Sequence, residues 1–143
     1  MAIAEWEHCL QYCDHRRLAV VEENGRGVRF VNKQQKHVAL YRVDDCLLME
    51  GKRCDFLFLV LEESRAFFVE LKGSDLEEAV RQIMRTVEQL GKKLSGYRLE
   101  GRIIMTRVRT PAVKSTYRIK LEKMLRRTGG SLAVKVNWDE VEV

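Results

Sequence analysis

The sequence predicts one α/β domain, a mixed central β-sheet flanked by helices, over residues 1–143. A chain of 143 residues has the length of a single domain, and 45% hydrophobic with 33% charged residues is the composition of a soluble globular protein. Short apolar or alternating runs, typical of strands, give way to two longer segments with apolar residues at helical spacing. No repeat or low-complexity segment divides the chain.

The first half of the chain is predicted to form a short helix, two strands, a turn and two more strands, in the order 3–14, 27–32, 37–43, 50–52, 54–62 and 66–72. The strands are predicted from apolar stretches such as "GVRFVN" and "HVALYRV". Glu63-Ser64 is expected to be the loop between the last two strands. These two strands therefore form a hairpin.

The second half is predicted to contain helix, strand, helix and strand, in the order 74–94, 99–108, 113–127 and 131–138. Ser74 is the expected N-cap of the first helix, and Glu77 completes a capping box. Thr110-Pro111 separates the strand from the second helix, which ends at Gly129-Gly130.

Positive charge is concentrated in one part of the chain. The formal net charge is +5, yet residues 98–127 hold ten Lys or Arg against two Glu, a local charge of +8. Such a block indicates a polyanionic partner, although a solvated helix face rich in lysine has the same composition. Five residues are the candidate contacts to nucleic acid: Arg107, Arg109, Lys114, Arg118 and Lys123.

Neither a secretion signal nor a membrane span is expected, so the predicted location is the cytoplasm. Its reducing environment predicts that all four cysteines are free thiols: Cys9, Cys13, Cys46 and Cys54. A structural zinc site is not favoured, because no CxxC pair occurs and the three histidines are scattered along the chain.

The predicted hairpin carries charged residues where a buried sheet would carry apolar ones. A two-residue loop places Asp55 opposite Lys72, so that Asp55, Glu70 and Lys72 project from one face. A register shifted by one residue would separate Asp55 from the other two. Two carboxylates, with the carbonyl of Leu71 as a further oxygen, suit Mg²⁺ or Mn²⁺. A salt bridge on a solvated hairpin face is the alternative.

Asp55, followed fifteen residues later by Glu70-Leu71-Lys72, resembles the motif of the PD-(D/E)xK nuclease superfamily. The resemblance covers about residues 40–106 and is sharpest over 53–82. It implies a restriction endonuclease-like core of helix, three-stranded meander, helix and strand (αβββαβ), here followed by a C-terminal helix and strand. It also implies that Asp55 and Glu70 bind the metal and that Lys72 positions or activates the attacking water.

The superfamily motif extends beyond these three residues. Cys54 stands where the motif has proline, and the tyrosine that one branch places after the helix glutamine is Thr86 here. Many members have a glutamate on the first helix that reaches the metal, and Glu5, Glu7, Glu22 and Glu23 are candidates. Asp44 and Asp45 precede the hairpin and could also lie near the site, although a turn-forming role is favoured for them. The candidate accessory residues are Gln82, Glu7 and Glu22.

The expected function is a Mg²⁺- or Mn²⁺-dependent nuclease that hydrolyses phosphodiesters, with DNA favoured over RNA. No sequence-reading motif occurs, so recognition of structure, ends or a partner-delivered substrate is expected. A homodimer would allow both strands to be cut. Two alternatives stay open: a catalytically silent nucleic-acid-binding or assembly module with the same fold, and an unrelated α/β protein whose basic helix binds an acidic partner.

Overall fold

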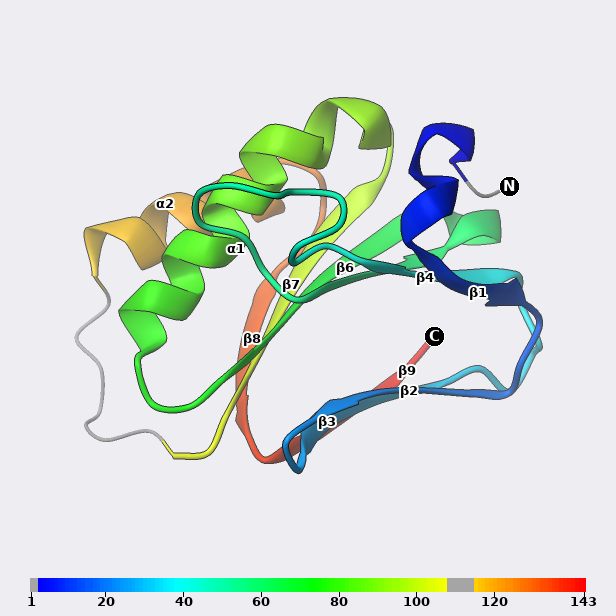
Figure 1. Ribbon diagram of the computed structural model, residues 1–143, viewed down its shortest axis with the longest axis horizontal. Helices are drawn as coiled ribbons and strands as arrows, with labels where there is room; N and C mark the ends of the chain where they lie inside the picture. The colour runs from blue at the N-terminus through cyan, green and yellow to red at the C-terminus, as the bar shows by residue number, and fades with distance from the viewer. Residues whose placement is uncertain (1–2, 108–114) are drawn as a thin grey trace.

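The computed structural model describes residues 3–107 and 115–143, with the side chain of Lys72 outside the described part. Its described residues form three layers: two helices, a six-stranded sheet and a three-stranded sheet (Figure 1). The helices cover one face of the large sheet, and the small sheet packs on the other. The predicted α/β class with a mixed sheet is therefore confirmed.

The large sheet has the strand order β1 (Leu10–Asp14), β4 (Val38–Arg42), β5 (Phe56–Val60), β6 (Arg65–Lys72), β7 (Arg98–Met105) and β8 (Leu132–Val136). Its first four strands are antiparallel, whereas β6, β7 and β8 are parallel. The crossover between β6 and β7 contains α1 (Leu76–Leu90), and the one between β7 and β8 contains α2 (Thr116–Arg126). Parallel neighbours require such crossovers.

The small sheet consists of β2 (Leu18–Glu23), β3 (Arg26–Val31) and β9 (Trp138–Glu142). β2 and β3 form an antiparallel hairpin, and the C-terminal β9 pairs in parallel with β3. Phe30 of β3 stacks on Phe58 of β5 with ring centroids 4.0 Å apart, which joins the two sheets. A second hydrophobic core therefore lies between the sheets.

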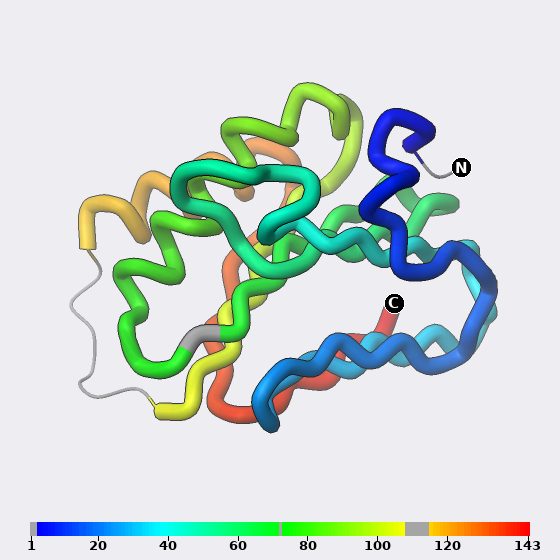
Figure 2. Tube along the Cα trace, viewed as in Figure 1, coloured from blue at the N-terminus to red at the C-terminus, as the bar shows by residue number. Residues whose placement is uncertain are grey.

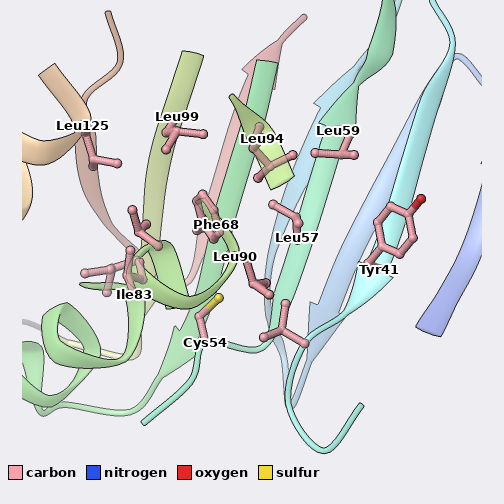
Figure 3. Close-up of a cluster of buried hydrophobic side chains, with 14 of the residues drawn as sticks. Tyr41, Cys54, Leu57, Leu59, Phe68, Ile83, Leu90, Leu94, Leu99 and Leu125 are labelled. Atoms are coloured by element: carbon pink, nitrogen blue, oxygen red, sulfur yellow. The ribbon is translucent and has the colours of Figure 1, made fainter. Parts of the chain in front are cut away.

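The main core lies between the helices and the large sheet (Figure 3). Because side chains alternate along a strand, Leu57 and Phe68 face α1, while Phe58 and Phe67 face the small sheet. Ile83 of α1 belongs to the same core as Phe68. Burial on both faces explains the almost continuous apolar sequence of β5.

Several predicted elements were wrong in type or missing. Residues 3–14 were predicted as a helix, but only Ala4–Cys9 is helical, as a 3₁₀-helix, and Leu10–Asp14 is β1. The strand forms because β4 supplies partners for its backbone groups, with Tyr12 opposite Leu40. β2 and β9 were not predicted. In the described residues, no helix is long and apolar enough to cross a membrane.

The prediction of four free thiols was wrong for two of them. Cys9 and Cys46 form a disulfide that joins the 3₁₀-helix to the loop after β4, with their Cα atoms 5.7 Å apart. Cys13 and Cys54 are free, as predicted. Cysteines 37 residues apart in sequence give no local sign of pairing, which depends on where β4 places its following loop.

Candidate functional site

The β5–β6 hairpin has a different register from the predicted one. Val60 pairs with Arg65 and Phe56 with Val69, so the connection is Leu61–Ser64 rather than two residues. Leu61–Glu63 forms a 3₁₀ turn, and Ser64 takes a left-handed conformation with φ of 50°. The pairing is displaced by two residues. A displacement of two keeps every side chain on its predicted face.

Asp55 therefore lies against the end of β6, beside Glu70. The N–H of Asp55 donates to the carbonyl of Val69 (3.1 Å), and the N–H of Leu71 donates to Asp55 Oδ2 (2.8 Å). Glu70 is buried, with 2% of its surface exposed. Two carboxyl groups thus share a desolvated position at the end of the hairpin.

The environment of Asp55 disfavours its charged form. Burial raises the pKa of Asp55 to about 6, and the N–H of Leu71 opposes this shift. The negative charges of Glu23 and Asp44 raise the pKa of Asp55 further, while the interaction with the side chain of Glu70 lowers it. The thiol of Cys54 has its pKa raised well above the ordinary value, first by burial and then by the charge of Glu70. A cation would relieve this concentration of negative charge.

The donor set fits a hard divalent cation. Two adjacent carboxyl groups supply oxygen ligands, which suit Mg²⁺ or Mn²⁺ better than soft metals. The N–H of Leu71 fixes the Asp55 carboxylate in orientation. The carbonyl of Leu71 as a ligand stays a prediction. Lys72 is the last residue of β6, opposite Met105 of β7, but its side chain lies outside the described part of the structure.

Two acidic residues outside the hairpin contribute to this site. Glu23 is the last residue of β2, and its negative charge raises the pKa of Asp55. The negative charge of Glu7 instead raises the pKa of Tyr41. Asp44 acts on Asp55 too and accepts a 2.7 Å hydrogen bond from Arg53 Nε. Glu23 is therefore, of the N-terminal glutamates, the one that the structure relates to Asp55.

Gln82 lies on α1, which is tied to the chain segment that ends at Asp55. Its backbone carbonyl accepts a hydrogen bond from the hydroxyl of Thr86 (2.7 Å), and that hydroxyl accepts one from the N–H of Cys54 (2.8 Å). The Oε1 atom of Gln82 is buried and has no hydrogen-bond partner among the described residues. Figure 2 traces the segment of residues 43–55 over α1 before it enters β5. Thr86 therefore has a positioning role that the sequence pattern did not reveal.

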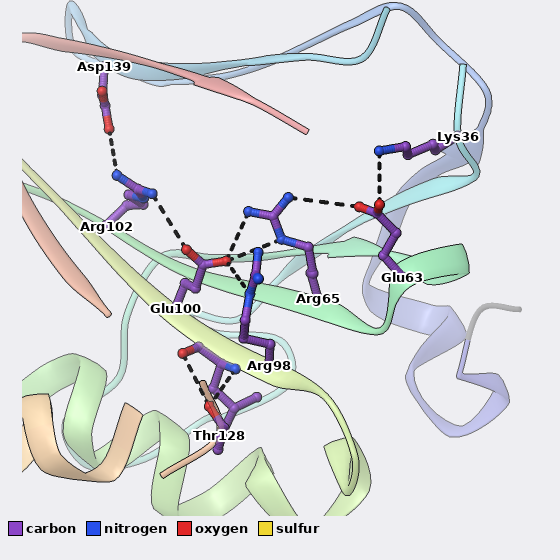
Figure 4. A network of polar contacts seen from close by, with 9 residues as sticks. Lys36, Glu63, Arg65, Arg98, Glu100, Arg102, Thr128 and Asp139 are labelled. Carbon is purple, nitrogen blue, oxygen red and sulfur yellow. Dashed lines mark hydrogen bonds and ion pairs between the residues drawn. The ribbon is translucent and has the colours of Figure 1, made fainter. Parts of the chain in front are cut away.

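Part of the basic block is used within the fold (Figure 4). Glu100 is buried, and its carboxylate accepts hydrogen bonds from Arg65 (3.0 Å) and Arg98 (3.3 Å) and pairs with Arg102 at 3.6 Å. Arg102 also bonds Asp139 of β9, which ties the large sheet to the small one. Arg98 and Arg102 are thus used in ion pairs with Glu100 of β7, at the end of the large sheet where β6 and β7 begin.

The candidate nucleic-acid contacts fall into three groups. Arg107 and Lys123 are exposed, Arg118 is half-buried and pairs with Glu122 at 3.7 Å, and Arg109 and Lys114 lie outside the described residues. A hollow of about 380 Å³ between α1 and α2 brings together residues that the sequence did not connect. It is lined by three basic residues, an acidic residue, a methionine and a tyrosine: Lys52, Arg81, Arg85, Glu88, Met84 and Tyr117. In it the Arg81 guanidinium lies 4.3 Å from the ring centroid of Tyr117.

Comparison with known proteins gives no match to this chain, whether with family models, curated proteins or solved structures.

Proposed function

We propose that this protein is a divalent-metal-dependent nuclease that hydrolyses phosphodiester bonds in nucleic acid, with DNA favoured over RNA. The observation that carries the proposal is the Asp55–Glu70 pair: a buried glutamate near the end of β6 and, just before β5, an aspartate whose backbone and side chain bond the residues on either side of that glutamate. Burying two acids together is costly unless a cation compensates them. The alternative of a solvated hairpin face does not account for a glutamate with 2% exposure.

The order of elements supports the same proposal. β4, β5 and β6 form an antiparallel meander, α1 follows, and β7 pairs in parallel with β6. The restriction endonuclease-like core has this order of three strands, helix and strand. The N-terminal helix of that core corresponds here to a 3₁₀-helix followed by β1, so the proposed likeness rests on the meander and the crossover.

In the proposed reaction, Asp55 and Glu70 would hold Mg²⁺ or Mn²⁺ through their carboxylate oxygens. The ion would supply positive charge to the scissile phosphate and lower the pKa of the attacking water. Leu71 keeps the Asp55 carboxylate oriented through its N–H. Lys72, two residues after Glu70, is assigned the role of stabilising negative charge in the transition state.

The substrate is proposed to contact exposed cations outside the acidic pair. Arg107 follows β7, and Lys123 lies with Arg126 and Arg127 around a shallow hollow of about 280 Å³ on α2. Contacts of this kind go to phosphates and make affinity fall with salt. Recognition by structure or through a partner, a homodimer and a cytoplasmic location remain parts of the proposal.

The test is a cleavage assay on single-stranded, duplex and branched DNA and on RNA, with Mg²⁺, with Mn²⁺ and with a chelator. Asp55→Asn is the informative variant, since the amide oxygen still accepts from Leu71 while the charge is lost. Glu50→Gln, an exposed acid in the loop before β5, is the matched control. We expect metal-dependent cleavage by wild type and Glu50→Gln and none by Asp55→Asn.

Two other outcomes have definite meanings. Salt-sensitive binding that needs no metal and leads to no cleavage would replace the nuclease with the catalytically silent binding module. Cleavage by folded Asp55→Asn at the wild-type rate would refute the assignment of the site. Lys72→Ala, checked for folding by circular dichroism, is expected to lose cleavage while it retains binding.

A further inference from the structure

A second group of ligand-type side chains lies away from the hairpin, around the Cys9–Cys46 disulfide. His8 stands next to Cys9 on the 3₁₀-helix, and the ligand atoms of His8, Cys9 and Cys46 all lie within 4.8 Å of one another. The Sγ of Cys46 lies 3.8 Å from the carbonyl oxygen of His8. We propose that, when the disulfide is reduced, these three side chains form a zinc site.

The ligand set is the one that zinc prefers. Thiolate and imidazole ligands bind Zn²⁺ at about 2.3 and about 2.0 Å, and two protein sulfurs with one nitrogen leave a fourth position for water. In a tetrahedral site two sulfurs lie about 3.8 Å apart, as follows from that bond length. The ligand atoms of His8, Cys9 and Cys46 are already within 4.8 Å of one another, so a zinc site needs only a local rearrangement of these side chains.

The surroundings of the disulfide can accommodate a zinc ion. Cys9 is buried at the end of the 3₁₀-helix, Cys46 is half-buried in the loop after β4, and His8 is exposed. The loop is held independently of the disulfide, because Arg53 bonds Asp44 and Asp45 at 2.7 Å each. These two contacts hold the loop that carries Cys46 when the disulfide is reduced.

The chemistry is balanced by a thiol reductant. A dithiol such as dithiothreitol gives two electrons and two protons to the Cys9–Cys46 bond, which becomes two thiols while the reductant becomes a disulfide. Zinc binding then releases the two thiol protons, and the two thiolates offset the charge of Zn²⁺. The same two cysteines therefore serve either as a disulfide or as zinc ligands, according to the redox state around the protein.

The experiment compares oxidised and reduced full-length protein, each incubated with Zn²⁺ and freed of excess metal. Thiol counts under denaturing conditions verify the two states. Bound zinc is measured by atomic spectrometry, and Co²⁺ replaces it to report thiolate ligation through its charge-transfer absorption. Variants are Cys46→Ser and His8→Ala. Cys13→Ser is the matched control, because Cys13 is also near a histidine, with its Sγ 3.1 Å from His37 Nε2.

We expect the reduced protein to retain one zinc per chain with a thiolate–cobalt band, and the oxidised protein to retain none. Cys46→Ser should lose the metal, Cys13→Ser should keep it, and His8→Ala should weaken binding by at least about tenfold, the loss that even an outer hydrogen-bond partner can cause. The proposal is overturned if reduced wild type retains no stoichiometric zinc, if Cys46→Ser or His8→Ala binds as wild type does, or if Cys13→Ser loses the metal. No readout here depends on nuclease activity.

Discussion

Replacing Asp55 by asparagine is expected to stabilise the fold near neutral pH, because Asp55 is held in an environment that disfavours its charge. Burial raises the pKa of Asp55 from 3.8 to about 6. The folded protein therefore binds a proton at Asp55 more tightly than the unfolded chain does. The cost of ionising Asp55 is fully present above the folded pKa and disappears as the pH falls toward the unfolded pKa.

The size of the effect follows from the shift. About two pKa units at 1.36 kcal/mol each correspond to about 2–3 kcal/mol of unfolding free energy. The asparagine amide keeps the acceptor for the Leu71 N–H and adds an N–H that can donate to Glu70. The free energy of unfolding of Asp55→Asn should therefore exceed that of wild type by about 2 kcal/mol at pH 8 and by close to zero at pH 4.

The assay is urea unfolding of both proteins, without divalent metal, at pH 4, 6 and 8. Glu50→Gln is the control for removal of an exposed carboxylate and should stay within about 0.5 kcal/mol of wild type throughout. A difference between Asp55→Asn and wild type that does not change with pH would refute the reasoning, as would a variant less stable than wild type at pH 8.

Three further predictions concern the scaffold, and each is measured by denaturant unfolding. Asp75→Ala should lower the free energy of unfolding by about 1 kcal/mol, since the Asp75 side chain caps α1 by accepting a hydrogen bond from the N–H of Glu78. Ser74→Ala should lower it little, and equal losses for the two variants would contradict this assignment of the cap. Gly130→Ala should be strongly destabilising because a Cβ there overlaps a backbone carbonyl, while Gly91→Ala has open space and should be neutral or stabilising. Glu100→Gln should cost about 3–5 kcal/mol, since it removes the buried charge that three arginines share, and a cost below 1 kcal/mol would be inconsistent with the network in Figure 4.

The sequence was sufficient for features that depend on local patterns. Hydrophobic runs predicted β5 and β6, and helical spacing predicted α1, although its N-cap is Asp75 rather than Ser74. Two neighbouring residues able to cap a helix are hard to rank from sequence, because the choice depends on the backbone conformation at the preceding turn.

Features that depend on distant partners could not be predicted in this way. Tyr12 belongs to a strand only because β4 lies beside it, and Glu23 acts on Asp55 only because the small sheet folds under the large one. The Asp55–Glu70 pair was predicted with the wrong register. The sequence did not reveal the 3₁₀ turn, which displaces the strand pairing by two residues. Because side chains alternate along a strand, a displacement by two leaves Asp55 and Glu70 on the same face of the hairpin, as predicted.

The most direct test of the central claim, that Asp55 and Glu70 form a cation site, is a ¹³C NMR titration of the side-chain carboxyl groups with and without Mg²⁺. The account predicts that the pKa of Asp55, about 6 in the metal-free protein, falls when Mg²⁺ is added, because the ion competes with the proton. As a control, the addition of Mg²⁺ should leave the chemical shift of the exposed Glu50 carboxyl group unchanged. An Asp55 titration that is unchanged at millimolar Mg²⁺ would contradict the claim.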